Sequence, residues 1–124
     1  MKKTVSIKKN FEYKRVYHRG RSVVGPYIAV YVLNNKGTQN RLGLTVSKKI
    51  GNAVERNRAK RLMRESYRLI EDEVLPGFDI VLVARQKCIN SNCNQVKASL
   101  ISAFKTLGVL NKGDMNEKNI DRPN

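Results

Sequence analysis

The pattern of apolar and polar residues over 41–70 predicts a strand, a loop and a long helix. Apolar side chains alternate with small or polar ones over 41–47, as in a strand that buries one face. Over 52–70 the apolar residues recur at helical spacing, so that one side of a helix would face a core. We assign to that side Glu55, Ala59, Leu62, Met63, Ser66, Leu69 and Ile70.

The opposite side of this helix is cationic and contains Asn57, Lys60, Arg61, Arg64 and Arg68. Like charges one turn apart on a helix repel each other by about 0.2–0.5 kcal/mol per pair. A charge run is often only a solvated face, but here no acid is interleaved with the cations. The pattern therefore favours a helix that binds a polyanion, with nucleic acid as the best candidate.

Residues 11–19 predict a short helix that ends at Gly20. Tyr13 and Tyr17 are one turn apart and therefore lie on the same side of it. On a short helix such a pair is most often part of the core. With Lys14 beside them, the two rings could equally form a platform on which unpaired bases stack. The pattern leaves both interpretations open.

Residues 27–33 are rich in β-branched and aromatic side chains and predict another strand. The segment 34–40 is polar and contains a glycine, so we expect 41–47 to return beside this strand as an antiparallel hairpin. The face that carries Tyr31 would then lie next to the small residues of its partner. Such a pairing would form a shallow trough.

The second half of the chain predicts a buried strand and a last helix. Residues 78–84 are almost continuously apolar, which indicates a central strand covered on both faces. Asn90 or Ser91 can cap the helix that follows, and Gly108 ends it.

The element order is therefore α-β-β-α-β-α, an α+β sandwich of helices on one mixed sheet. We expect a single domain over 1–110 that begins with a mobile basic arm, residues 1–9. Low hydrophobicity and many polar residues predict a disordered tail over 111–124.

The charge of the chain is concentrated in one half. The 124 residues carry a net charge of +15. Residues 1–70 contain 18 Lys or Arg against three acids, whereas residues 71–124 contain seven of each sign. This asymmetry indicates one face that meets a polyanion. The basic helix lacks the large apolar face that insertion into a membrane surface requires.

Several classes of site are excluded by the composition. Cys88 and Cys93 do not have the spacing of a zinc site, and His18 is the only histidine. No phosphate-binding loop, membrane span or secretory signal is recognisable. We therefore expect a cytoplasmic protein with two free thiols, no catalytic residue, no bound metal of its own, and no membrane or small-molecule partner.

Three segments resemble the protein subunit of bacterial ribonuclease P: RLGLTVSKKIGNAVERNRAKRLMRE at 41–65, FEYKRVYHRG at 11–20 and FDIVLVAR at 78–85. The likeness covers about residues 8–107 in the same order of elements. In that family a large RNA with bound Mg²⁺ is the catalyst and removes the 5′ leader of precursor tRNA. The protein supports folding of the RNA, lowers its metal requirement and holds the leader.

The resemblance implies roles for individual residues. It implies that the catalytic RNA is contacted by Lys48, Lys49, Arg56, Asn57, Arg58, Lys60, Arg61, Arg64 and Arg68. It also implies that the precursor tRNA leader is bound by Tyr13, Lys14, Tyr17 and Tyr31. Arg58 lies near the core edge of the helix, so a bridging role is its alternative. The family also implies a left-handed β-α-β crossover, against the general right-handed rule.

Two other functions are compatible with parts of the pattern. A generic RNA-binding protein of the ribosomal type would share the charge, but it would have no reason to carry tyrosines beside the cationic helix. A metal-dependent nuclease would need clustered carboxylates for two ions about 4 Å apart. The densest acids, residues 71–73, lie beyond the end of the basic helix.

Overall fold

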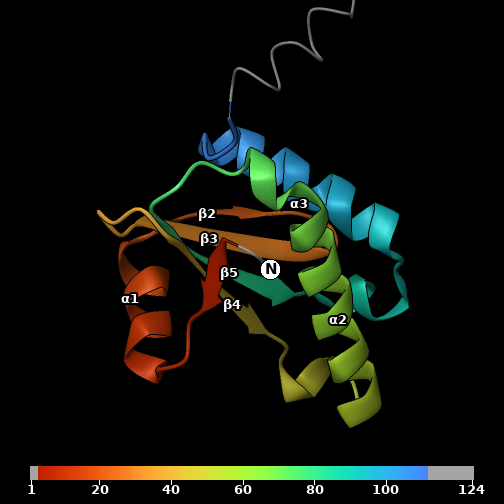
Figure 1. The fold of residues 1–124 in the computed structure, drawn as a ribbon. Coiled ribbons are helices and arrows are strands. Elements are labelled where there is room, and N and C mark those ends of the chain that lie inside the picture. The colour runs from red at the N-terminus through yellow and green to blue at the C-terminus, as the bar shows by residue number, and fades with distance from the viewer. Residues whose placement is uncertain (1–2, 112–124) are drawn as a thin grey trace, which may run out of the picture.

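A mixed β-sheet forms the centre of the molecule, with helices on both faces (Figure 1). The structure is a computed structural model and describes residues 3–111. Its strands are β1 (Thr4–Ser6), β2 (Arg21–Val24), β3 (Ile28–Asn34), β4 (Asn40–Thr45) and β5 (Phe78–Ala84). Its α-helices are α1 (Asn10–Arg19), α2 (Ala53–Ile70) and α3 (Cys93–Leu107). The predicted α+β class with a mixed sheet is confirmed.

The strand order is β1-β4-β5-β3-β2. β4 is parallel to β1 and β5, whereas β3 is antiparallel to β5 and β2. The predicted hairpin of β3 and β4 is therefore wrong, because β5 lies between them. The reason is the burial of β5: Ile80, Val81 and Leu82 are fully covered, and only a central position covers both of its faces. The handedness of the β4-α2-β5 crossover stays a prediction.

Two separate apolar layers hold the helices to the sheet. α2 and α3 pack on one face, where the core includes Met63, Leu82 and Phe104. α1 packs on the other face, where a smaller cluster is formed around Val16 and Val81. The sheet thus lies between α1 and α2.

The N-terminal segment is better ordered than the predicted mobile arm. Residues 4–6 form β1 beside β4, and Ile7 is buried. The side chain of Thr4 lies 3.0 Å from the hydroxyl of Tyr67, which is fully buried in α2. Tyr67 was missing from the predicted inner stripe of this helix, whereas Leu69, assigned to it, is 50% exposed. The difference arises because Thr4 of β1 and Phe104 of α3 both contact Tyr67 on this side of α2.

The start of α3 also differs from expectation. Asn92, and not Asn90 or Ser91, caps α3, and its side chain accepts a hydrogen bond from the Gln95 N–H. Ser91 is unavailable because its hydroxyl donates to the Cys88 carbonyl at 2.7 Å.

The chain is still ordered where the predicted tail begins. Leu110 is buried, and the backbone N–H of Asn111 donates to the carbonyl of Glu73. The rest of the predicted tail, residues 112–124, lies outside the described residues. No helix within residues 3–111 combines the length and the apolar character that crossing a bilayer requires.

Candidate nucleic-acid interface

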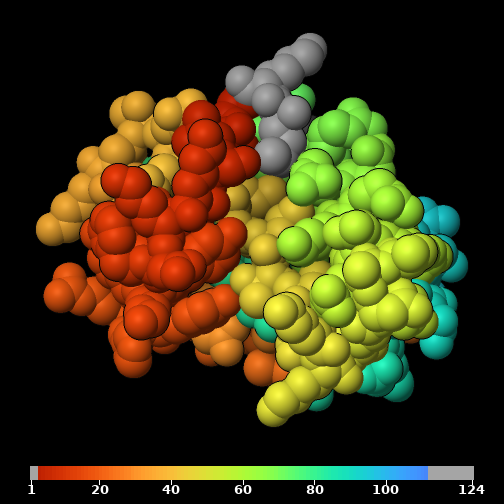
Figure 2. Space-filling model, turned by 90° about the horizontal axis from the view of Figure 1, so that it is seen from below, coloured from red at the N-terminus to blue at the C-terminus, as the bar shows by residue number. Residues whose placement is uncertain are grey.

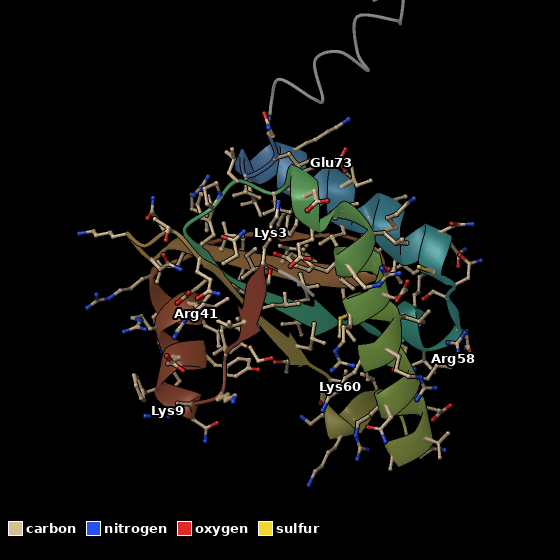
Figure 3. The ribbon with its side chains drawn as sticks, viewed as in Figure 1. Lys3, Lys9, Arg41, Arg58, Lys60 and Glu73 are labelled. Carbon is tan, nitrogen blue, oxygen red and sulfur yellow. The ribbon has the colours of Figure 1, made fainter. Side chains whose placement is uncertain are left out.

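The cationic face of α2 consists of Asn57, Lys60, Arg61, Arg64 and Arg68. The N-terminus of this helix is fixed by Asn52, which forms reciprocal side-chain-to-backbone hydrogen bonds with Glu55. All five residues of the face except Lys60 are exposed, and Lys60 is half-buried. Figure 3 shows Lys60 on the side of α2 that faces β4 and α1.

The cations of this face differ in whether they form an ion pair with an acid of the protein. Arg68 forms an ion pair with Glu65 on the exposed side of the helix. This pair raises the pKa of Arg68 and lowers the pKa of Glu65. Arg61 and Arg64 have no ion-pair partner within residues 3–111. Like Lys60, they can therefore bind a phosphate without first breaking an ion pair within the described residues.

Two other arginines of the predicted set bind the protein itself. Arg58 donates to the carbonyls of Ile89 and Ser91, at 2.6 and 2.9 Å. Arg56 donates to the carbonyl of Gly51 at 2.8 Å. The geometry of Arg58 matches its alternative role, a bridge between α2 and the turn that precedes α3.

A cavity of about 470 Å³ lies between α2 and the start of α3. Its lining includes Arg58, Arg61, Arg64 and Cys93. Cys93 is partly exposed and Cys88 is buried, and both thiols are free, as predicted. Burial raises the pKa of the Cys88 thiol. The cavity is therefore an extension of the cationic face toward α3.

Lys48 and Lys49 are exposed in the 3₁₀ turn Lys48–Ile50, at the end where α2 begins. The Ser47 side chain caps this turn by accepting a hydrogen bond from the N–H of Lys49. The turn thus carries the two lysine side chains at the start of the cationic face.

A second surface, the tyrosine patch, consists of Tyr17, Tyr31, Thr45 and Val83. The rings of Tyr17 and Tyr31 meet edge to face, with centroids 5.0 Å apart and planes at 77°. The hydroxyl of Tyr17 lies 3.2 Å from that of Thr45. Tyr17 is 37% exposed, and the other three side chains are half-buried. The patch therefore presents aromatic and aliphatic surface to solvent.

Tyr13 has a different environment from Tyr17. Its ring covers Gly43 of β4, where a Cβ would lie 2.6 Å from the ring. Its hydroxyl donates to the carbonyl of Ile7 at 3.4 Å, and burial raises its pKa. Of the two interpretations left open, packing describes Tyr13, whereas Tyr17 retains surface on which a base can stack. Lys14, between them in sequence, is exposed.

The strand that lies beside Tyr31 also differs from the one predicted for the trough. Tyr31 does not pair with Gly43, because Val81 of β5 lies between them in the sheet register. In the next row on the same face, Val83 lies between Ala29 and Thr45. Val83 was not among the predicted site residues. The alternation of β5 could have indicated it only if the strand order had been known.

Arg41 ties α1 to the sheet beside this patch. It donates through Nε and Nη2 to Asp79 at 2.9 and 3.1 Å, and through Nη1 to Glu12 at 2.6 Å. The hydrogen bond from Arg41 holds the pKa of Glu12 below its usual value, and the bond to Asp79 raises the pKa of Arg41. This network was not predicted, because its three residues come from three distant segments.

The cationic face of α2 and the helix α1 border a common cavity beside β1 and β4. A cavity of about 190 Å³ is lined there by Tyr13 and Leu44 and by Lys60 and Arg64 of α2. Figure 2 shows a hollow in this part of the surface, between the red atoms of α1 and the yellow-green atoms of α2. The cationic face and the aromatic side of α1 are thus neighbours across one depression.

The described part of the chain contains no group of three or more His, Cys, Asp or Glu side chains that could hold a metal ion. An α+β domain that presents a cationic helix next to exposed aromatic rings is typical of a protein that binds RNA.

Comparison with known proteins identifies the family. A family model described as Ribonuclease P matches residues 1–108. The chain belongs to the ribonuclease P protein family, and an RNA partner within a ribonucleoprotein follows from that membership. The contacts of individual side chains with RNA stay predictions.

Relatives and solved structures agree with this assignment. A ribonuclease P protein component from Alkaliphilus metalliredigens is 39% identical over 110 residues, 89% of this chain and 99% of that protein. One from Bacillus cereus is 46% identical over 110 residues, 88% and 96% of the two chains. The solved RNase P protein of Staphylococcus aureus has a TM-score of 0.77 at 40% identity, over 86% and 97%. That of Thermotoga maritima has a TM-score of 0.71 at 28% identity, over 78% and 92%.

Proposed function

We propose that this protein holds two RNAs at once, the catalytic RNA of ribonuclease P and the 5′ leader of precursor tRNA. The observation that carries the proposal is that α1, the helix that carries Tyr17 of the tyrosine patch, and the cationic face of α2 border one cavity, which is lined by Tyr13, Lys60 and Arg64. An aromatic surface and a cationic surface that share one depression can bring a single strand of one RNA next to the backbone of another.

The cationic face of α2 would bind the backbone of the catalytic RNA. Arg61 and Arg64 supply unpaired guanidinium groups, which bind phosphate oxygens through two parallel hydrogen bonds. Lys48 and Lys49 extend the same field beyond the start of the helix. Arg58 would act indirectly, by fixing the turn before α3 through its two bonds to backbone carbonyls.

The tyrosine patch would hold the leader. A base stacked on Tyr17 gains about 1–3 kcal/mol irrespective of its identity, which suits a leader of variable sequence. Tyr31 supports the ring of Tyr17 from the side, and Val83 provides apolar surface beneath. Lys14 is exposed on the same helix and can approach the leader backbone.

The chemistry of cleavage belongs to the RNA in this proposal. Mg²⁺ held by the catalytic RNA would supply the activated water and stabilise the leaving oxygen. The protein positions the substrate and neutralises phosphates, which lowers the concentration of metal that the folded RNA requires. A cytoplasmic location, where tRNA precursors are processed, is part of the same proposal.

Reconstitution of cleavage tests this function. A bacterial ribonuclease P RNA and a precursor tRNA are incubated at low Mg²⁺ with and without the protein. We expect cleavage at the mature 5′ end only when RNA and protein are both present. The double variant Arg61→Ala/Arg64→Ala should support less cleavage at low Mg²⁺ than the wild-type protein. The control variant Lys105→Ala, which removes an exposed cation of α3, should support as much cleavage as the wild type.

The other outcomes identify the alternatives. Cleavage by the protein alone would favour a protein nuclease. Tight binding without rescue of cleavage would favour a generic RNA-binding protein. Either result would contradict the proposal.

A further inference from the structure

Phe11 is an exposed aromatic side chain that the two proposed surfaces do not use. It lies in the first turn of α1 and is 59% exposed, more than any other aromatic residue within 3–111. Its position on the helix is about 160° from Tyr13 and about 120° from Tyr17. The ring therefore faces away from the tyrosine patch and contributes to neither apolar layer of the fold.

Two cations lie over this one ring. The ammonium nitrogen of Lys9 and the guanidinium carbon of Arg15 are each 5.9 Å from the centroid of Phe11. Both distances are within the range of a cation–π contact, about 6 Å. Two like charges held near the same ring repel each other, and a phosphate group between them would relieve that repulsion.

The surroundings of Phe11 have one sign of charge. Exposed cations continue along this part of the chain at Lys8, Lys14 and Arg19. The single acid of α1, Glu12, is bound to Arg41 at 2.6 Å and does not neutralise them. An exposed aromatic ring among cations fits a nucleotide, since the base can stack on the ring while its phosphates meet the charges. An apolar protein partner would instead bury these charges at a cost.

We propose that Phe11, Lys9 and Arg15 form a second stacking platform, which takes one base of the precursor tRNA leader beyond the tyrosine patch. This inference rests on the proposed function, because it assumes that the leader lies along α1. The catalytic RNA is the less suitable occupant, since Phe11 points about 160° away from Tyr13, the α1 residue that lines the cavity shared with the cationic face of α2.

The absence of tryptophan from the sequence provides a direct test of stacking. In Phe11→Trp the indole is the only one in the full-length chain, and a stacked base quenches its fluorescence. Val24→Trp is the matched control, because Val24 is 61% exposed, on β2. We expect a single-stranded oligoadenylate of about ten nucleotides to quench Phe11→Trp and not Val24→Trp. Equal quenching of both, or of neither, would overturn the platform.

The leader assignment is tested in the holoenzyme with two precursors, whose leaders have about 4 and about 16 nucleotides. We expect Phe11→Ala to weaken binding of the long-leader precursor roughly tenfold and to leave the short-leader precursor unchanged. Phe11→Tyr, which keeps the ring, should restore the affinity. Equal loss for both precursors, or weaker binding of the catalytic RNA, would overturn the assignment to the leader.

The failure of this inference can be told from that of the proposed function. Tyr17→Ala with the short-leader precursor reports on the tyrosine patch alone. If Tyr17→Ala does not weaken binding of the short-leader precursor, the proposed function is wrong, irrespective of the result for Phe11→Ala. If Tyr17→Ala weakens binding and Phe11→Ala does not affect the long leader, only the second platform is wrong.

Discussion

The ring of Tyr13 lies against the backbone of Gly43, so close that a Cβ at position 43 would be 2.6 Å from the ring. Glycine thus allows the ring of an α1 residue to reach the surface of the sheet. The hydroxyl of Tyr13 then donates to the carbonyl of Ile7, immediately after β1 ends. This contact anchors α1 beside β1 and β4, at the cavity that α1 shares with the cationic face of α2.

Substitution of this glycine should destabilise the fold. Gly43→Ala forces the ring of Tyr13 to move, and overpacking of this kind lowers the free energy of unfolding by about 1–3 kcal/mol. Urea denaturation measures the loss. In a Tyr13→Leu background the same substitution should cost less, because the obstructing ring is absent. An equal cost in both backgrounds would show that Tyr13 is not the cause.

The link between Glu12 and Arg41 should make stability depend on pH. The bond from Arg41 lowers the pKa of Glu12 in the folded protein, so the ionised carboxylate stabilises the fold above its unfolded pKa, about 4.3. This stabilisation is lost as the pH falls through the folded pKa. We therefore expect the difference in free energy of unfolding between wild type and Glu12→Gln to be largest near neutral pH and to disappear in acid. A difference that does not change with pH would contradict this account.

Arg61 should contribute to RNA binding and not to folding. It is exposed and has no ion-pair partner within the described residues, so Arg61→Ala should change the free energy of unfolding by less than about 0.5 kcal/mol. The slope of log K for the catalytic RNA against log salt should decrease by about one, for one lost phosphate contact. A filter-binding titration over a range of salt concentrations measures the slope. An unchanged slope would remove Arg61 from the interface.

Arg58, in contrast to Arg61, should contribute to folding and not directly to RNA binding. Arg58→Ala leaves the carbonyls of Ile89 and Ser91 without their donor, which should lower the free energy of unfolding by about 1–3 kcal/mol. At a temperature where the variant is fully folded, its salt slope should equal that of the wild type. A reduced slope with unchanged stability would assign Arg58 to direct RNA contact.

Local sequence pattern was sufficient for much of the fold. A glycine after the helical pattern predicted the end of α3, and Gly108 there has a left-handed φ of +74°. A continuous apolar run predicted the burial of 78–84. The cationic face of α2 could also be predicted, because helical periodicity alone places those side chains together.

Pairings between distant segments could not be predicted in this way. The polar turn after β3 suggested a hairpin, but the burial of β5 on both faces decided the strand order. Tyr67 was not assigned to the core because its partner, Thr4, lies in a strand too short to be recognised. The same limit applies to the site, where Arg41 and Val83 gain their roles only from neighbours across the sheet.

The affinity of the holoenzyme for precursor and mature tRNA shows whether the tyrosine patch binds the leader. We expect Tyr17→Ala to weaken precursor binding by about 1–3 kcal/mol and to leave binding of mature tRNA, which has no leader, unchanged. Tyr17→Phe keeps the ring but loses the contact with Thr45, and it should bind the precursor nearly as well as wild type. Equal losses for precursor and mature tRNA would show that Tyr17 supports the fold, and would contradict the account.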